Sequence, residues 1–387
     1  MSGLINDSDE HRAIRESVRG IAKRYGGQYF LDRARSNGHI DELWGDLGDA
    51  GLLGVHLPEE YGGGGGGMAE AVVVVEELSA HGMPLLIWVI SPAICGSILA
   101  DHGSEEMKRE WLPALADGSR KMAFGLTEPD AGSNSHDIKT TARRDGDGWV
   151  ISGQKYYISA IDQSDAVLLI ARDADHTTAD RKALSIFVIP TDTPGLTFTQ
   201  IPTSIVSPDK QFMVFLDEVR VGPEALVGTA GSGMRQVFSG LNPERILVGA
   251  ICGGIGRYAV DRATDYARTR TVWSAPIGGH QGVAHPLAES HIDVEVSRLA
   301  TKHAAELADQ ESDAVGEAAN IAKFAASEAA LRALDQAIQT HGGNGLSEEY
   351  GLSDLWFVTR LMRTAPVSRE MVLNFVAQTS LGLPRSY

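Results

Sequence analysis

Short hydroxyl-bearing side chains, gathered in one segment, are the first indication of chemistry in this chain. From Phe124 the sequence runs FGLTEPDAGSNS, and QKYYIS ends the segment at Ser159. Thr127, Ser133 and Ser159 can each donate and accept a hydrogen bond, and Tyr157 can cover an aromatic face. Such groups suit a planar ring with polar edges and a phosphate-bearing tail. Each residue taken alone is better explained as part of a surface hairpin, so the hypothesis depends on their combination.

The elements that hold these groups are predicted to be β-strands. KTTARRDGDGWVISGQKYYIS alternates polar and apolar residues on both sides of Asp145–Gly148, a pattern typical of two strands joined by a tight turn. Four further strand patterns follow, separated by Pro, Gly and Asp: DAVLLIAR, KALSIFVIP, GLTFTQI and QFMVFLDEVRV. We therefore predict a β domain over residues 122–232.

Helical periodicity dominates on both sides of this domain. Apolar residues recur at helical spacing in residues 1–121, and again in Ile246–Arg270, Pro286–Ala308 and Ala314–His341. Long helices joined by short loops favour bundles, which places a second helical domain over residues 233–387. The predicted fold class is α+β multidomain: an N-terminal helical bundle, a middle β domain and a C-terminal helical bundle.

Composition narrows the possible partners. The 387 residues carry 34 Lys and Arg against 51 Asp and Glu, a net charge of −17. Nucleic acid is not expected, because phosphate contacts need clustered Lys and Arg. Cys95 and Cys252 show no CxxC spacing, and the N-terminus lacks the apolar core of a signal peptide. We therefore predict a cytoplasmic protein, and we predict no metal site.

Two segments imitate functional motifs. The glycine run Gly62–Gly67 has no Lys-Ser or Lys-Thr after it and no clear strand before it, so it indicates a flexible turn instead of a phosphate cradle. Residues 83–100 are uncharged and apolar, but Pro84 and Pro92 interrupt them and they barely reach the ~18 residues of a membrane helix. A buried helix and loop fit this segment better than a membrane span.

The order of domains and the motifs within them resemble the acyl-CoA dehydrogenase family over essentially the whole chain. The resemblance implies an FAD site lined by TEPDAGS and by the QKYYIS segment, in which Tyr157 stands where the family usually has Trp. It implies that Ser133 contacts CoA, although a turn hydroxyl is an equally good explanation. The flavin contacts that it implies in this region are Phe124, Leu126, Thr127, Tyr157 and Ser159.

The resemblance also implies a second set of FAD contacts, which in the family come from a neighbouring subunit. RTVW followed by Gln281 matches the family's R-x-x-F…Q pattern, and IQTHGGNG matches the segment near the FAD diphosphate. Glycines there allow close approach of the backbone to a phosphate. A dimer or tetramer with FAD at the subunit interface is therefore implied. The contacts are Arg270, Trp273, Gln281, Gln339, Gly342 and Gly343, together with Ser368.

The catalytic base departs from the commonest family pattern. Ungapped alignment puts Pro366 where many members carry Glu in a Y-E-G-T/S motif, and Pro cannot take a proton. GLNPER instead resembles the G-L-D-x-E-R sequence of the isovaleryl-CoA and long-chain subgroup, so Glu244 is the predicted base and Arg245 is predicted to orient the substrate pocket. The structural alternative makes Asn242 a helix N-cap and Glu244 a dipole partner. Glu370 is a weaker candidate base.

The implied reaction is FAD-dependent α,β-dehydrogenation of an acyl-CoA to a trans-2-enoyl-CoA, with electrons passed to an electron-transfer flavoprotein. Trp88, Ile90 and Ile94 fall in the region that walls the family's acyl cavity, although core packing explains each of them better. Two alternatives stay open. One is a same-fold flavin oxidase or monooxygenase, and the other is a non-catalytic subunit of a mixed oligomer.

Overall fold

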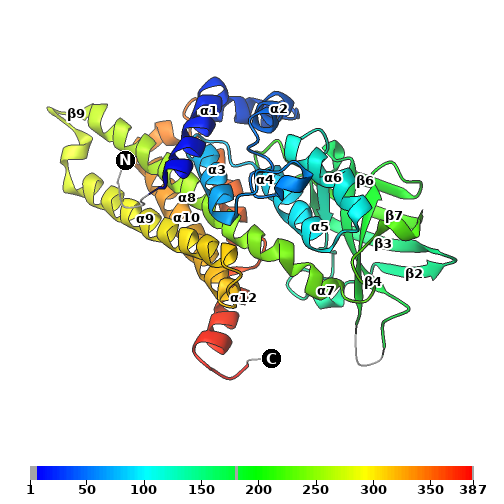
Figure 1. The fold of residues 1–387 in the computed structure, drawn as a ribbon. Coiled ribbons are helices and arrows are strands. Elements are labelled where there is room, and N and C mark those ends of the chain that lie inside the picture. Colours follow the sequence, from blue (N-terminus) through cyan, green and yellow to red (C-terminus); the bar gives the residue numbers. More distant parts are fainter. Residues whose placement is uncertain (1–6, 179–181, 386–387) are drawn as a thin grey trace.

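The computed structural model describes residues 7–178 and 182–385, which form helical, β and helical regions in chain order (Figure 1). In Figure 1 the sheet lies at one end of the molecule and the long helices extend to the other end. This arrangement confirms the predicted fold class.

Two of the N-terminal helices, α1 and α6, begin at serine side-chain caps, and the N-terminal helices bury their apolar faces. The Ser8 hydroxyl accepts the His11 N–H, and the Ser104 hydroxyl accepts the Met107 N–H. The helices are α1 (Asp9–Arg35), α2 (Asp41–Asp49), α3 (Met68–Ala80), α4 (Leu86–Trp88), the π-helix η2 (Val89–Gly96), α5 (Ser97–His102) and α6 (Glu105–Asp117).

The apolar segment 83–100 forms α4, η2 and the start of α5, with Pro92 inside the π-helix. Its side chains are mostly buried in the core of the protein. Within the described ranges, no helix combines the length and the apolar character needed to cross a membrane.

The glycine run is an ordered turn, which corrects the prediction that it is flexible. The N–H groups of Gly64, Gly65 and Gly66 donate to the carbonyls of Gly54, Leu57 and Val55 over 2.8–2.9 Å. A Cβ atom at Gly63 would lie 2.2 Å from the Leu57 carbonyl oxygen. Close packing of two backbone segments therefore requires glycine here, and three of the amides that could face a phosphate are already bonded.

The middle region is a mixed sheet with the strand order β6-β7-β3-β2-β4-β5-β8, and β1 pairs parallel with β4. Asp145 pairs with Gly148 across the β2–β3 turn, which confirms the predicted hairpin. The strands are β1 (Met122–Gly125), β2 (Thr141–Asp145), β3 (Gly148–Ser159), β4 (Ala166–Asp173), β5 (Leu184–Pro190), β6 (Leu196–Gln200), β7 (Gln211–Val221) and β8 (Leu226–Val227).

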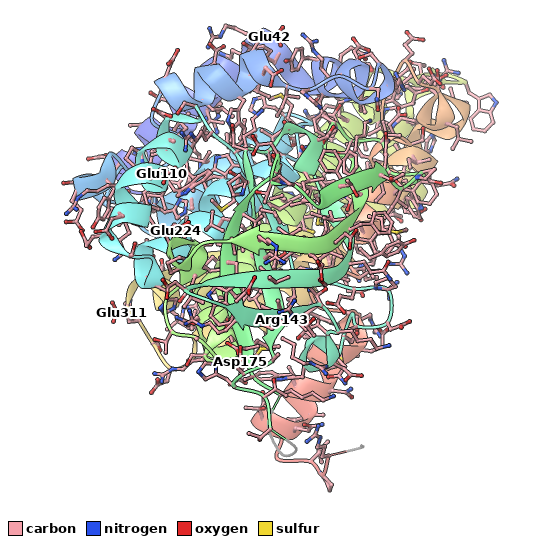
Figure 2. The ribbon with its side chains drawn as sticks, turned by 90° about the vertical axis from the view of Figure 1, so that its right-hand side faces the viewer. Glu42, Glu110, Arg143, Asp175, Glu224 and Glu311 are labelled. Atoms are coloured by element: carbon pink, nitrogen blue, oxygen red, sulfur yellow. The ribbon has the colours of Figure 1, made fainter. Side chains whose placement is uncertain are left out.

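The outer surface of the sheet end is charged. Figure 2 looks onto this end and shows Glu42, Glu110, Arg143, Asp175 and Glu224 around its outside. Apolar strand residues instead fill the interior, where the rings of Trp149 and Phe187 lie 5.2 Å apart between centroids. Charged side chains thus gather on the outer surface of the sheet end, while most of the interior side chains are apolar.

The C-terminal region is a bundle in which α8 packs against α3, α9 and α10. A Cβ atom at Gly254 would lie 2.3 Å from the Glu76 carbonyl oxygen, so this glycine permits the close approach of α8 and α3. The elements are α7 (Gly233–Gln236), α8 (Phe238–Thr269), β9 (Thr271–Val272), β10 (Ala275–Pro276), α9 (Gln281–Asp309), α10 (Val315–His341), η7 (Gly342–Leu346), α11 (Leu355–Leu361) and α12 (Arg369–Phe375).

Helix α8 begins earlier than the sequence indicated. Asn242 is not its N-cap and Pro243 is not its first residue, because α8 starts at Phe238 and already continues a helical backbone at Val237. Pro243 therefore lies inside the helix. Glu244 is displaced from the first turn, where the helix dipole acts most strongly, so the dipole explanation of Glu244 is wrong.

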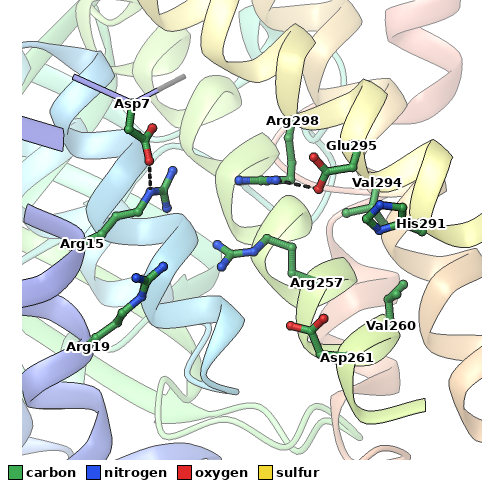
Figure 3. A pocket seen from close by; sticks show the side chains of 10 residues that line it. All are labelled: Asp7, Arg15, Arg19, Arg257, Val260, Asp261, His291, Val294, Glu295 and Arg298. Carbon is green, nitrogen blue, oxygen red and sulfur yellow. Dashed lines mark hydrogen bonds and ion pairs between the residues drawn. The ribbon is translucent and has the colours of Figure 1, made fainter. Parts of the chain in front are cut away.

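A buried charge cluster joins the two helical regions. Arg15 of α1, Arg257 of α8 and Arg298 of α9 reach the Glu76 carboxylate of α3 over 3.0, 2.9 and 2.8 Å. Burial alone would raise the pKa of Glu76, but the three guanidinium groups lower it to about 2. Figure 3 shows the arginines around a cavity of about 150 Å³ beside this cluster. Since these charges pair with one another, the cluster is a structural joint.

Candidate active site

The loop after β1 and the end of β3 lie side by side and form the first candidate surface. The Tyr156 N–H donates to the Thr127 carbonyl over 2.9 Å. Phe124 lies in β1, and Leu126 and Thr127 follow it; all three are half-buried. The structure therefore brings the TEPDAGS and QKYYIS segments together, although they are far apart in the sequence.

A bulge in β3 turns Tyr157 outward. The register between β3 and β7 shifts between Lys155 and Ile158, and Tyr157 has a left-handed backbone with φ of 58°. This conformation is uncommon for an aromatic residue and persists only where the surrounding pairing fixes it. The Tyr157 side chain is 55% exposed and its ring contacts the Tyr156 ring at 4.3 Å between centroids, so it presents an exposed aromatic surface next to the segment that carries Thr127.

Ser159 is held in place by a residue that the sequence did not single out. Its hydroxyl lies 2.9 Å from Nε2 and 3.1 Å from Oε1 of Gln211, at the start of β7. Ser159 is half-buried and Gln211 is buried. A glutamine that opens an otherwise apolar strand pattern was the available signal for Gln211.

Lys155 and Glu128 form a buried ion pair behind this surface. The Lys155 ammonium is 2.8 Å from Glu128 Oε1 and donates to the Leu126 carbonyl over 3.0 Å. Burial lowers the pKa of Lys155 to about 8, against the opposing effect of Glu128. Burial alone would raise the pKa of Glu128, but Lys155 and the Lys139 N–H lower it. The pair fixes the loop that carries Leu126 and Thr127.

The two predicted substrate contacts lie in different regions. Ser133 is exposed in the loop between β1 and β2. Arg245 lies on α8, where its guanidinium donates to the Asn242 side-chain oxygen over 3.0 Å. Because Ser133 is exposed, it is available to a large ligand that extends out of the core.

The second predicted FAD set gathers at the opposite end of the molecule. Arg270 precedes β9 and Gln281 opens α9, while Trp273 is 94% exposed with φ of 58°. The rings of Tyr266 and His341 stack at 4.2 Å, which brings the end of α8 beside the end of α10. Figure 1 shows β9 at one end and the sheet at the other. One chain therefore does not bring the two predicted sets together.

The glycines after α10 differ in what the lack of a side chain permits at each position. Gly342 has a φ of 59°, and a Cβ atom there would meet nothing within 4 Å. A Cβ atom at Gly343 would also meet nothing, whereas one at Gly345 would lie 2.4 Å from the Ile338 carbonyl oxygen. Gly342 and Gly343 are thus exposed and open to a ligand, as is Gln339 one turn earlier. The phosphate explanation fails for Gly345, because internal packing requires it.

Glu244 is a carboxylate with few partners. It is half-buried on α8, and in the described part of the chain no hydrogen bond or ion pair within 4 Å reaches it. Burial raises its pKa to about 7, although Arg245 and Lys323 lower it. Burial raises the pKa of the Cys95 thiol on η2, and the negative charge of Glu244 raises it further. A carboxylate that is protonated and deprotonated near neutral pH, with unused lone pairs, has the properties of a general base.

A cavity of about 510 Å³ opens beside this turn of α8. Its walls come from the start of α8, the start of α10 and the segment at α12, and both polar and apolar groups face it. Arg245 and Asn242 contribute from the same helix as Glu244. The lining residues are Phe238, Asn242, Arg245, Ser312, Asp313, Val315, Gly316, Asn320, Val367, Met371 and Phe375.

Of the three residues predicted to wall the acyl cavity, Trp88 and Ile94 are buried in the core and Ile90 is only half-buried. Trp88 is fully buried and its indole N–H donates to the Leu52 carbonyl over 3.2 Å, so it is a packing residue. Ile94 lies against α8, because a Cβ atom at Gly240 would be 2.8 Å from its Cγ2. Ile90 is half-buried.

The segment before α12 carries the other predicted residues. The Ser368 hydroxyl caps α12 by accepting the Met371 N–H over 3.3 Å, which is a structural use of that side chain. Glu370 is exposed. The Val367 carbonyl accepts a hydrogen bond of 2.7 Å from Lys323 of α10, a buried residue that the sequence did not single out. A lone lysine in the Ala-rich apolar pattern of α10 was the available signal.

Comparison with protein families supports the resemblance over most of the chain. Three family models match: acyl-CoA dehydrogenase N-terminal domain at residues 8–119, middle domain at residues 123–219 and C-terminal domain at residues 231–381. The chain is 55% identical over 382 residues to acyl-CoA dehydrogenase FadE12 of Mycobacterium tuberculosis, covering 98% of each chain.

Solved structures show the same architecture. A glutaryl-coenzyme A dehydrogenase in complex with glutaryl-CoA is 28% identical, with a TM-score of 0.93 and coverage of 100% of this chain and 98% of that one. The glutaryl-CoA dehydrogenase of Mycobacterium smegmatis in complex with FADH2 is 26% identical, with a TM-score of 0.90 and coverage of 98% and 96%.

Proposed function

Since the chain belongs to the acyl-CoA dehydrogenase family, we propose that it oxidises an acyl-CoA thioester to the trans-2-enoyl-CoA with FAD as its cofactor. The observation that carries the proposal is Glu244, a desolvated carboxylate that accepts no side-chain hydrogen bond in the described part of the chain, and whose neighbours on α8, Asn242 and Arg245, line a cavity of about 510 Å³. Its position on α8 supports a base of the type that the isovaleryl-CoA and long-chain subgroup uses.

The chemistry of the donor set fits a flavin. Tyr157 offers an exposed aromatic ring, and Thr127 and Ser159 supply hydroxyls from the adjoining loop and from the end of β3. Phe124 and Leu126 add apolar contacts from the β1 side. When bound there, FAD supplies the acceptor for the hydride that leaves the substrate β-carbon.

Glu244 has one task in this reaction, which is removal of the α-proton. A carboxylate with a pKa of about 7 is a stronger base than an ordinary one, and it is still largely ionised at slightly alkaline pH. Arg245 and Asn242, on the same turn of α8, line the cavity and are assigned to orient the thioester. Ser133, exposed at the loop between β1 and β2, is assigned to the CoA end of the substrate.

Polarisation of the thioester carbonyl is assigned to the Val367 N–H. Pro366 carries no N–H, and in the described structure the N–H of Val367, a cavity-lining residue, makes no hydrogen bond. Val367→Pro should therefore return the carbonyl stretch of a bound acyl-CoA, measured by infrared difference spectroscopy, toward its frequency in solution. A lowered frequency that survives in this variant would exclude the assignment.

A second copy of the chain completes the FAD site in this proposal. The hairpin with Arg270 and Trp273, the start of α9 at Gln281 and the turn after Gln339 lie away from Tyr157 in the same chain. We assign these groups, with Gly342 and Gly343, to the FAD of a partner subunit in a cytoplasmic dimer or tetramer. Electrons leave to an electron-transfer flavoprotein. The Ser368 hydroxyl continues to cap α12, and Ser368 is assigned a secondary contact with FAD.

The decisive experiment is anaerobic reduction of the purified yellow protein by a panel of straight and branched acyl-CoAs. At least one should bleach the flavin and yield the enoyl-CoA. Glu370→Gln should bleach at a rate near that of the unmodified protein, because Glu370 is exposed to solvent whereas Glu244 is desolvated. A flavin that dithionite reduces but no acyl-CoA reduces would contradict the proposal, and fast reoxidation by oxygen would favour the oxidase alternative.

Subunit complementation tests the shared FAD site. Arg270→Ala should lower FAD retention about tenfold to a hundredfold through loss of a charge-assisted phosphate contact. Co-expression of Arg270→Ala with a Tyr157→Ala variant should restore some full-affinity sites, because mixed dimers combine one intact copy of each half. Arg268→Ala, which removes an exposed arginine from the last turn of α8, is the matched control. FAD retention that stays normal in Arg270→Ala would remove this residue from the site.

A further inference from the structure

Lys323 is a fully buried ammonium whose counter-charge is not obvious. It lies on α10 with no exposed area, and its ammonium donates to the neutral carbonyl of Val367 over 2.7 Å. A buried charge needs an opposite charge or it loses its proton. Burial lowers the pKa of Lys323 to about 8, and nearby negative groups oppose that effect. The identity of the negative group therefore decides what Lys323 does.

The groups that face Lys323 come from three elements. Cys252, Glu244 and Arg245 lie on α8, and Glu328 lies on α10 one turn further along. On the segment before α12 the facing group is the Val367 carbonyl, which is uncharged.

Elimination leaves one counter-charge. Glu328 already accepts Arg363 at 2.6 Å and Arg369 at 3.0 Å. Burial raises the pKa of Cys252 to about 12, so Cys252 is a neutral thiol. Glu244 has no other hydrogen bond or ion pair in the described part of the chain, and its own facing groups are Arg245, Lys323 and the Cys95 thiol.

We propose that Lys323 is a positioning residue of the proposed reaction, which holds the Val367 segment against α10 and, in addition to Arg245, supplies positive charge that stabilises the ionised form of Glu244. The inference rests on the proposed function. One side chain thereby connects the two parts of the site that must meet the same thioester, namely the base on α8 and the Val367 N–H. Removal of the ammonium would leave Glu244 less acidic and the Val367 carbonyl without its donor.

The principal test is the pH dependence of single-turnover flavin reduction in the holoenzyme. Lys323→Met keeps the aliphatic stem and removes the charge, so the acid limb of the rate profile should move to higher pH by roughly one unit. Lys323→Arg should restore the limb to near its original pH. Arg332→Met is the matched control, because it removes an exposed cation from the same helix. A limb that stays within ~0.2 unit of the parental value in Lys323→Met overturns the inference.

Hydrogen exchange provides the second readout. The backbone of residues 367–371 should exchange at least several-fold faster in Lys323→Met than in Arg332→Met, because the Val367 carbonyl loses its donor. Equal exchange in these two variants would exclude the role in holding the segment.

A reciprocal measurement needs neither turnover nor a folded Lys323→Met protein. Glu244→Gln removes the counter-charge, so the pKa of Lys323 should fall, which ¹³Cε-lysine NMR can follow after assignment with Lys323→Arg. An unchanged Lys323 titration overturns the inference. A parent protein whose flavin no acyl-CoA bleaches overturns the proposed function instead, so the two failures are distinguishable.

Discussion

Two lysines, one in the β domain and one in the C-terminal bundle, are buried to the same extent but contact different partners. Lys155 and Lys323 are both fully buried, and burial lowers the pKa of each to about 8. Lys155 contacts Glu128 directly at 2.8 Å. Lys323 contacts a neutral carbonyl, and it faces Glu244 without an ion pair within 4 Å.

The two glutamates show what this difference means for chemistry. Glu128 accepts hydrogen bonds from the Lys139 N–H, the Thr140 N–H and the Lys155 ammonium, and these donors lower its pKa despite burial. Glu244 has no such donors, and burial raises its pKa to about 7. Burial therefore leaves a carboxylate ionised as a structural brace when donors occupy its lone pairs, and raises its pKa toward neutrality, as the proposed base requires, when they do not.

Exchange of each glutamate for glutamine should separate these roles most strongly. Glu244→Gln removes the basic carboxylate, so anaerobic flavin reduction by an active acyl-CoA should slow by ~10²-fold to 10⁴-fold with FAD still bound. Glu128→Gln should instead lower the free energy of unfolding and leave the rate of the remaining folded holoenzyme within about tenfold. Stopped-flow reduction measures both. A near-parental rate in Glu244→Gln would show that another group is the base.

Lys155→Met should produce the largest loss of stability. It leaves the Glu128 charge buried without its ion-pair partner, which typically costs about 3–5 kcal/mol in the free energy of unfolding. Lys139→Met is the matched control, because it removes an exposed lysine from the loop that carries Glu128 and should cost less than about 1 kcal/mol. Urea denaturation at fixed protein concentration compares the two. Equal losses would mean that Lys155 is not a brace.

The pH dependence of stability should identify Glu244 without any substrate. Its pKa is about 7 in the folded state and near 4.5 in the unfolded state, so the folded state binds more protons between these values. Stability therefore falls as pH rises from 4.5 to 7, by roughly 1–3 kcal/mol after allowance for partial exposure. Glu244→Gln should lack this decrease when urea denaturation is measured at several pH values. Parallel curves for parent and variant would contradict the raised pKa.

Glu328→Gln should have the smallest effect, although Glu328 is another carboxylate that faces Lys323. Arg363 and Arg369 already neutralise it, and both are partly exposed. The acid limb of flavin reduction should stay within about 0.3 pH unit of its parental position, and stability should change by less than about 1 kcal/mol. A shift as large as that of Lys323→Met would make Glu328 the counter-charge of Lys323.

Local patterns in the sequence were sufficient to predict much of the fold. The alternation around Asp145–Gly148 predicted the β2–β3 hairpin, because strand periodicity and turn chemistry depend on adjacent residues. Helical spacing predicted the two helical regions for the same reason. The sequence also placed Glu244 in GLNPER, but it misplaced the start of α8, because Asn242 and Pro243 are typical of an N-cap and a first helical residue and here lie inside the helix.

The partners of the site residues were decided only by the tertiary structure. Lys155 finds Glu128 across 27 positions, Ser159 finds Gln211 across 52, and Lys323 finds Val367 across 44. No periodic signal connects such residues, because packing of distant elements sets which donor meets which acceptor. The placement of the Tyr157 face and the Arg270 hairpin at opposite ends has the same origin. Residue types determined which chemistry was available, and the packing of distant elements determined that Glu128 is paired whereas Glu244, in the described part of the chain, has no ion pair within 4 Å.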